Sequence, residues 1–243
     1  MRGKMEFDIR RFTNDRLFLF AGHYGSGKSE IAVNFALSLA RLGDTVIVDF
    51  DIVKSYFRSS GARGALEKEG VRVIAPVYAN TNVDVPALPA EISSVFGNAA
   101  AYAVFDVGGD GAGAKAVSRY HDDFISERAS NFFVFNLRRP MTSDIRGALE
   151  IFHEIQDGAR LPFTAIVSNT NLLSQTAPSD LTDGLSAALE LSARLSLPVA
   201  FSAVMETVAR QPYADSAFSK FLELSDKYSI PVFKLKKYII MDY

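Results

Sequence analysis

The sequence of 243 residues contains no cysteine, which excludes disulfides, thiolate metal sites and a cysteine nucleophile. It also has no apolar run near the roughly 18 residues of a membrane-spanning helix. Neither sign of charge dominates, since 26 basic residues stand against 28 acidic ones, so a broad nucleic-acid-binding surface is not expected. Residues 1–11 are charged and lack the apolar core of a secretory signal. These absences predict a cytoplasmic protein with no integral membrane segment and no nucleic-acid partner.

What is present is an ordinary globular composition, with 48% hydrophobic and 22% charged residues. Continuous apolar runs predict strands at 17–21, 45–51, 71–75, 101–106, 132–136, 163–169, 197–202 and 231–235. Helices are expected at 30–42, within 59–70, and at 91–96, 142–156, 181–195 and 213–228. This alternation predicts an α/β fold with a mainly parallel sheet covered by helices on both faces. No linker or repeat divides the chain, so residues 1–243 are interpreted as a single domain.

One stretch matches the phosphate-binding loop pattern of Gly, four residues, Gly, Lys, and Ser or Thr. Its residues are Gly22, His23, Tyr24, Gly25, Ser26, Gly27, Lys28 and Ser29. An expected strand precedes it and an expected helix follows it, which is the context that the pattern requires. The glycines let backbone N–H groups point at a polyphosphate, and the helix adds the positive end of its dipole. We expect Lys28 to reach the β- and γ-phosphates and the Ser29 hydroxyl to bind Mg²⁺.

Acidic residues end two of the expected strands. Asp49 and Asp51 close the second strand, and Asp106 closes the fourth. A lone acid at a strand end is usually a helix cap or a solvated residue, but three of them behind a phosphate loop favour a Mg²⁺ site that also orients the attacking water. The stretch from Asp106 to Asp110 is typical of a switch loop, in which Gly109 lets a backbone N–H approach the γ-phosphate and Asp110 is a weaker candidate.

Taken together, residues 22–29, 48–52 and 106–110 resemble the MinD/ParA/nitrogenase-iron-protein class of P-loop proteins. The stretch Asp49 to Arg58 makes the chain especially similar to bacterial ATP-binding proteins of the CobQ/CobB/MinD/ParA group, and the similarity runs over roughly residues 16 to 235. The resemblance implies a P-loop NTPase fold with a seven- or eight-stranded sheet, an ATP site with Mg²⁺, and often a nucleotide-controlled homodimer.

The resemblance also implies roles for individual residues. Lys28 and Ser29 would act on the phosphates and the metal, Asp51 near the attacking water, and Asp106 in the metal shell. Asn169, at the end of the sixth expected strand, would contact the base; the alternative is that it is a turn residue.

The sequence departs from this class at one point. MinD and ParA carry a second lysine early in the loop that reaches the partner subunit's nucleotide, whereas this chain has His23 and Tyr24 there. Lys54 or Arg58 are candidates to supply a cation instead, unless they are simply solvated. Residues 138–140, Arg-Arg-Pro, either meet a substrate or phosphate or form an ordinary charged surface loop.

The sequence therefore favours a Mg²⁺-dependent ATP-binding protein, a slow ATPase that acts as a switch for an unidentified protein partner. The absence of the Asn-Lys-x-Asp guanine signature also favours ATP. One alternative is an ATP-dependent phosphotransferase or ligase with an acceptor pocket near residues 78–89 and Arg138. The other is a nucleotide-gated binding protein without enzymatic activity.

Overall fold

The computed structural model describes residues 7–12, 14–50, 62–75, 91–98, 100–109, 111–209 and 216–239. Its strands are β1 Leu17–Ala21, β2 Thr45–Phe50, β3 Arg72–Ile74, β4 Tyr102–Val107, β5 Ser130–Phe135, β6 Ala165–Ser168, β7 Val199–Met205 and β8 Val232–Leu235. Its α-helices are α1 Lys28–Leu39, α2 Ala62–Lys68, α3 Glu91–Phe96, α4 Gly111–Val117, α5 His121–Ser126, α6 Ile145–Ala159, α7 Pro178–Leu195, α8 Glu206–Ala209 and α9 Ser216–Lys227. Short 3₁₀ turns are η1 Ile9–Phe12, η2 Ser118–Tyr120, η3 Pro140–Thr142 and η4 Leu173–Gln175.

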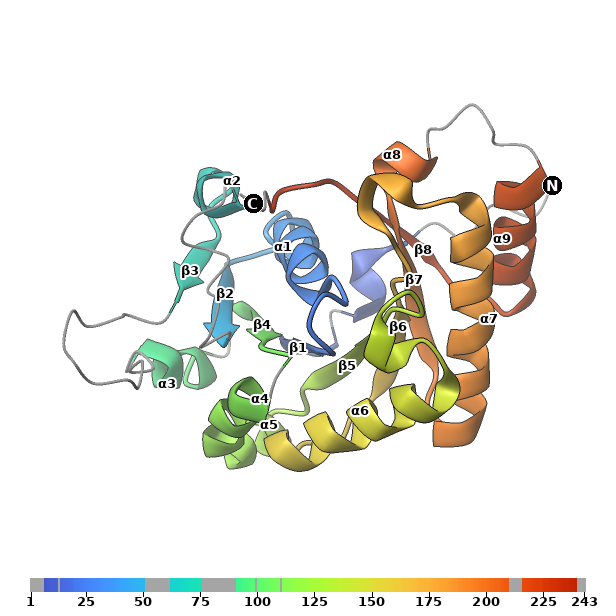
Figure 1. Ribbon diagram of the computed structural model, residues 1–243. Coiled ribbons are helices and arrows are strands. Elements are labelled where there is room, and N and C mark those ends of the chain that lie inside the picture. The colour runs from blue at the N-terminus through green and yellow to red at the C-terminus, as the bar shows by residue number, and fades with distance from the viewer. Residues whose placement is uncertain are drawn as a thin grey trace, which may run out of the picture.

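The strands form one sheet with the order β3-β2-β4-β1-β5-β6-β7-β8, and every pair of neighbours is parallel (Figure 1). This confirms the expected parallel sheet and its count of seven or eight strands. β1 lies inside the sheet between β4 and β5. The loop that leaves its carboxyl end therefore starts in the middle of the sheet edge where parallel α/β folds bind ligands.

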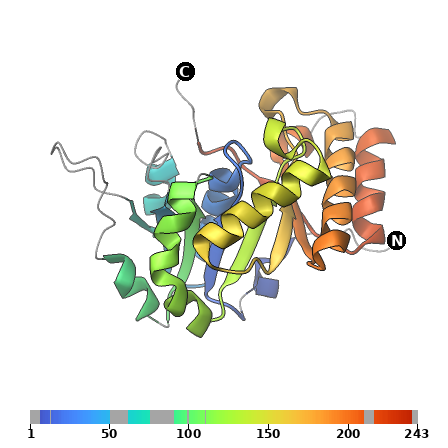
Figure 2. The same ribbon diagram turned by 60° about the horizontal axis from the view of Figure 1, so that its bottom comes forward.

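Alternation along the strands divides the core into two layers. In β1, Leu17 and Leu19 belong to the apolar cluster under α3, α4, α5, α6, α7 and α9, whereas Phe18 and Phe20 belong to the cluster under η1, α1 and α2. Both faces of the sheet are thus covered, which explains why the strands are continuously apolar. Figure 2 shows α4 and α6, in green and yellow, in front of the strands, with α7 and α9 side by side at the right.

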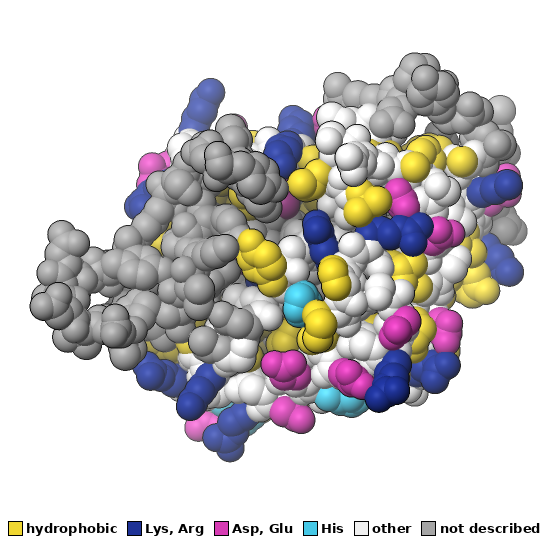
Figure 3. Space-filling view, viewed as in Figure 1, with side chains coloured by type: hydrophobic (Ala, Val, Ile, Leu, Met, Phe, Trp, Pro, Cys, Tyr) yellow, Lys and Arg dark blue, Asp and Glu magenta, His cyan; other side chains and the backbone are white. Residues whose placement is uncertain are grey.

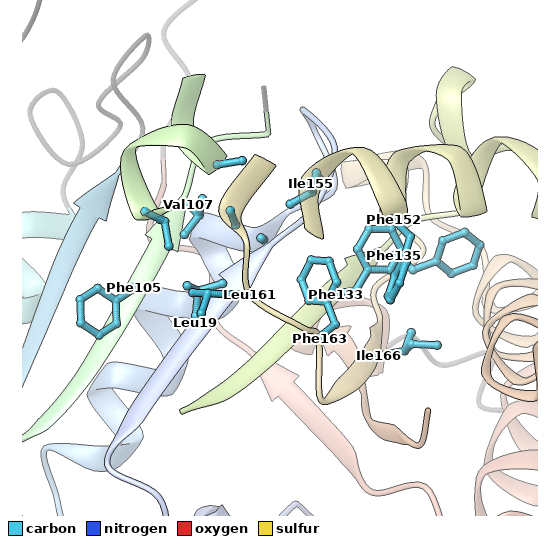
Figure 4. Packing of buried hydrophobic residues seen from close by; sticks show 14 of the residues in the cluster. Leu19, Phe105, Val107, Phe133, Phe135, Phe152, Ile155, Leu161, Phe163 and Ile166 are labelled. Carbon is cyan, nitrogen blue, oxygen red and sulfur yellow. The ribbon is translucent and has the colours of Figure 1, made fainter. Parts of the chain in front are cut away.

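Aromatic packing fixes helix α6 to the sheet (Figure 4). The ring of Phe133 on β5 lies 5.3 Å from the rings of both Phe152 and Phe163, between centroids. All three side chains are buried, and burying each of them contributes roughly 1.5–3 kcal/mol. Because β5 and α6 are locked together, the loop between them is held at the carboxyl edge of the sheet, beside the phosphate-binding loop.

The helix starts follow their local signals. The Asp144 side chain accepts a hydrogen bond from Gly147 N–H at 2.8 Å, which makes Asp144 the N-cap of α6. Helix α7 begins at Pro178, three residues before the expected start, because proline at the first helical position has a favourable φ and no N–H to satisfy.

One region of helix was not expected. Residues 111–126 form α4, η2 and α5, although the glycines at the start of this stretch indicated a loop. Ala114, Val117 and Phe124 are buried in the apolar cluster between these helices and the sheet. The stabilisation from this burial outweighs the low helix propensity of Gly111 and Gly113. Within the described ranges, no helix is both long and apolar enough to cross a membrane.

Candidate nucleotide-binding site

The phosphate-binding loop joins the end of β1 to the start of α1, as the motif requires. Lys28 is the first residue of α1 and is 3% exposed, and Ser29 is 7% exposed. No described residue forms a hydrogen bond or an ion pair with the Lys28 ammonium. A largely buried lysine that lines a cavity at a helix N-terminus is an environment that stabilises an anion.

Asn169 holds the loop in shape. Gly27 has φ of +86°, and a Cβ atom at this position would lie 2.3 Å from Asn169 Nδ2. That amide nitrogen donates to Ser26 O at 2.7 Å, in a buried hydrogen bond. Asn169 is therefore at the site, as expected, but its amide N–H contacts the loop backbone. A contact between Asn169 and the base stays a prediction. Because the amide nitrogen of Asn169 is bonded to Ser26 O, such a contact would use its amide oxygen Oδ1.

A hydrogen-bond network supports Asn169 from the neighbouring strand ends. Asn171 Nδ2 donates to Asn169 O at 3.0 Å, and Asn136 Nδ2 donates to Asn171 O at 3.2 Å. Leu137 N donates to the Thr170 hydroxyl oxygen at 3.0 Å. The loops that follow β5 and β6 are thus tied to each other and, through Asn169, to the phosphate-binding loop.

The predicted acids that the structure describes lie at the carboxyl ends of adjacent strands. Asp106 on β4 is paired in register with Asp49 on β2 and with Phe20 on β1, one residue before the end of β1. Both carboxylates are 1% exposed. Asp51, Lys54, Arg58, Asp110 and the segment 78–89 lie outside the described residues, so their predicted roles stay predictions.

Gly109 packs directly on the phosphate-binding loop. A Cβ atom at this position would lie 2.5 Å from Tyr24 N and 2.6 Å from Gly22 O. Only glycine permits this approach of two backbones. The loop after β4 is thus in contact with the segment that would surround a γ-phosphate, as expected for a switch loop.

The donor set fits Mg²⁺. The Ser29 hydroxyl at the start of α1 and the Asp106 carboxylate at the end of β4 provide oxygen ligands, which this ion prefers. Among the described residues, no three carboxylate or imidazole groups gather into a metal-binding cluster.

A cavity of about 550 Å³ extends from the loop toward the ends of β6, β7 and β8. Its loop end is formed by Gly25, Gly27, Lys28, Ser29 and Arg139. Its far end is formed by Asn171, Leu173, Met205, Val208, Leu235 and Ile239. Glu30, Ser174, Thr207 and Lys237 also line the cavity. It therefore combines the positive charges of Lys28, Arg139 and Lys237 with apolar side chains, which suits a phosphorylated molecule with a flat, less polar moiety.

The segment after β8 forms a wall of this cavity and is anchored to α1. The Glu30 carboxylate accepts hydrogen bonds from Tyr238 N at 2.6 Å and Ile239 N at 3.3 Å. Asn34 binds Lys236 through both main-chain groups, with distances of 2.9 Å. Burial raises the pKa of Glu30 above its ordinary value, although these N–H donors act in the opposite direction. No sequence motif predicts this contact, and only the position of Glu30 directly after the loop places it near the site.

The two arginines after β5, Arg138 and Arg139, have different surroundings. Neither is an ordinary solvated residue of a charged surface loop, which was one of the two alternatives for residues 138–140. Arg138 binds Asp180 at 2.8 Å and Asp183 at 2.7 Å on α7, and the hydrogen bond to Asp180 raises the pKa of Arg138. Arg138 therefore supports the fold. Arg139 instead donates from Nε to Gly25 O at 2.6 Å and lines the cavity.

Exposed hydrophobic side chains surround the site. Tyr24 in the loop is 51% exposed, Met141 in η3 is 53% exposed and Leu173 in η4 is 44% exposed. Figure 3 shows hydrophobic and basic side chains side by side in the centre of this face.

Solved structures of FtsY proteins have a similar fold. The crystal structure of FtsY from Mycoplasma mycoides matches with a TM-score of 0.50 and 18% identity, over 93% of this chain and 71% of that one. Cell division protein FtsY from Thermotoga maritima matches with a TM-score of 0.50 and 15% identity, over 86% and 67%. Signal recognition particle receptor FtsY from Elizabethkingia anophelis, in complex with GDP, matches with a TM-score of 0.50 and 12% identity, over 88% and 63%. No protein-family profile and no curated protein matches the chain.

At these identities the likeness concerns the fold. The parallel sheet with the phosphate-binding loop after its central strand is the P-loop NTPase fold, and this chain has that fold.

Proposed function

We propose that this chain binds a nucleoside triphosphate with Mg²⁺, hydrolyses it slowly, and changes its contacts with a protein partner according to the bound nucleotide. The observation that carries this proposal is the enclosed Lys28 at the start of α1, with no hydrogen-bonding partner among the described residues. A buried charge needs a counter-charge, which the β- and γ-phosphates of a bound nucleotide would supply.

Each residue has a defined part in this proposal. Lys28 and the loop N–H groups hold the phosphates and stabilise the charge that develops during transfer of the γ-phosphoryl group. Ser29 and Asp106 hold Mg²⁺, which neutralises phosphate charge when it is bound. Asp51, directly after β2, orients the attacking water.

The base is proposed to be adenine. Guanine presents two adjacent N–H donors, which a carboxylate recognises best. Among the described residues that line the cavity, Glu30 is the sole carboxylate, and it already accepts from Tyr238 and Ile239. Asn171 uses one N–H of its amide on Asn169 O, and its amide oxygen accepts from Leu173 N at 3.5 Å. Its second N–H and the remaining lone pair of the oxygen could bind adenine. GTP is the second candidate, because one FtsY protein of similar fold was solved with GDP.

The partner is proposed to bind at the edge of the sheet that holds the nucleotide. Tyr24, Met141 and Leu173 expose apolar surface there, and Gly109 joins the switch loop to the same edge. A second copy of the chain is the first candidate, as a nucleotide-controlled homodimer. Sedimentation velocity with ADP and with a non-hydrolysable ATP analogue tests this: a monomer in both states excludes the homodimer.

Calorimetric titration with ATP, GTP, ADP and GDP, with and without Mg²⁺, tests binding and base preference together. Lys28→Ala removes charged hydrogen bonds worth about 1.5–3 kcal/mol, which is roughly 10- to 150-fold in affinity. Lys220→Ala, at an exposed position on α9, is the matched control and should bind like the parent. Equal affinity in Lys28→Ala and the parent contradicts the proposal.

Asp51→Asn separates binding from hydrolysis. Because Asp51 is proposed to act on the attacking water, its replacement should lower kcat strongly and change nucleotide affinity little. A loss confined to affinity, or unchanged turnover, shows that Asp51 does not have this role.

A further inference from the structure

Arg139 lies in the loop between β5 and η3 and reaches back to the phosphate-binding loop. Its Nε donates to Gly25 O at 2.6 Å, which fixes the guanidinium over the first half of that loop. Arg139 lines the same cavity as Gly25, Gly27, Lys28 and Ser29. The side chain is half-buried, so the guanidinium is placed at the phosphate end of the cavity rather than in solvent.

The charge of Arg139 is not neutralised by a described carboxylate. Its neighbour Arg138 forms two ion pairs with α7, whereas Arg139 forms none with the residues that the structure describes. A guanidinium has five N–H donors in a planar fork, and Nε uses one of them here. The remaining donors match the paired oxygens of a phosphate group.

We propose that Arg139 binds the β- and γ-phosphates of the nucleotide from within the same chain. This inference rests on the proposed function. It makes Arg139 a second cation of the site beside Lys28, supplied by the loop after β5 rather than by the phosphate-binding loop itself. It also couples the nucleotide to η3, where exposed Met141 stands next to Pro140 on the proposed partner surface.

The test uses Arg139→Gln. The Nε2 atom of glutamine is as many bonds from the backbone as Nε of arginine, so this variant can keep the hydrogen bond to Gly25 O while it removes the charge and the other donors. Arg139→Lys restores the charge. Arg146→Ala, an exposed arginine on α6 with its side chain 90% exposed, controls for a general change of charge.

Calorimetry with ATP, ADP and AMP in the presence of Mg²⁺ gives the decisive comparison. We expect Arg139→Gln to weaken ATP and ADP binding about 10- to 100-fold and AMP binding less than about threefold, because ATP carries both the β- and the γ-phosphate, ADP carries the β-phosphate, and AMP carries neither. Arg139→Lys should recover part of the loss, and Arg146→Ala should bind all three ligands like the parent.

Two results overturn the inference. ATP affinity equal to that of the parent in Arg139→Gln shows that the guanidinium does not contact the phosphates. An equal loss for ATP, ADP and AMP shows that Arg139 only supports the loop. If Arg139→Gln fails to fold, the same ratios measured with Arg139→Lys and Arg139→Met decide. If the parent protein binds no nucleotide, the proposed function is contradicted. If the parent binds ATP and Lys28→Ala abolishes that binding, the proposed function stands, and the Arg139 variants test the role of Arg139 alone.

Discussion

The contact between Gly27 and Asn169 gives the sharpest test of how the phosphate-binding loop is held. In Gly27→Ala the new side chain must adopt φ near +86°, which costs roughly 1–2 kcal/mol. Its Cβ would also lie 2.3 Å from Asn169 Nδ2, so the amide must move and lose its buried hydrogen bond to Ser26 O. That loss adds about 1 kcal/mol. The free energy of unfolding should therefore fall by about 2–3 kcal/mol.

A matched control isolates the backbone contribution. Gly70 has φ of +79°, and a Cβ atom there would have no heavy atom within 4 Å. Gly70→Ala should therefore lose only the roughly 1–2 kcal/mol that comes from the backbone conformation. The Asn169→Ala background removes the collision, so Gly27→Ala should cost less there than in the parent, by about 1 kcal/mol.

Urea unfolding of the nucleotide-free proteins, followed by far-UV circular dichroism, measures the free energies of unfolding of the parent, the three single variants and the Gly27→Ala/Asn169→Ala double variant. Two results refute the reasoning: a cost of Gly27→Ala no larger than that of Gly70→Ala, or an equal cost in the parent and in the Asn169→Ala background. Nucleotide affinity should fall in Gly27→Ala as well, because the displaced loop no longer presents its N–H groups together.

Two further predictions concern stability. The pKa of Glu30 is raised above its ordinary value of 4.5, so the folded state binds this proton more tightly than the unfolded state does, and stability should decline as pH rises through the folded pKa. Glu30→Gln should flatten this decline in unfolding curves between about pH 4 and pH 8, and an unchanged slope contradicts the argument. The Asp180 carboxylate accepts from Arg138 and from Ala177 N, both at 2.8 Å, so Asp180→Ala should cost about 2–3 kcal/mol in urea unfolding. Asp183→Ala, whose side chain is 53% exposed, should cost less than about 1 kcal/mol, and equal costs would exclude the buried pair as the stabilising one.

Local patterns predicted the parts of the fold that depend on neighbouring residues. The strand, the loop and the helix around Lys28 were predictable because hydrophobic periodicity and the glycine spacing both lie within a short stretch. The position of Asp106 followed from its place at the end of an apolar run. The helices at 111–126 were missed, since their burial depends on packing against the sheet rather than on their own sequence.

The contacts that shape the site lie far apart in the sequence. Arg139 and Gly25 are 114 positions apart, and Glu30 and Tyr238 are 208 positions apart. No periodicity or motif links such residues, because they meet only after strands β1, β5 and β8 have taken their places in the sheet. Sequence alone therefore placed Arg139 in a charged loop, and only the fold placed it in the cavity.

Three residues outside the phosphate-binding loop hold it in place, and each of them contacts the main chain of the loop. Asn169 binds Ser26 O, Arg139 binds Gly25 O, and Gly109 packs against the main chain of Tyr24. The His23 ring also reaches the loop main chain, since its Nδ1 atom lies 3.0 Å from Tyr24 O, within hydrogen-bond distance. Tyr24 is 51% exposed and His23 is half-buried, so these two side chains lie at the accessible edge of the site.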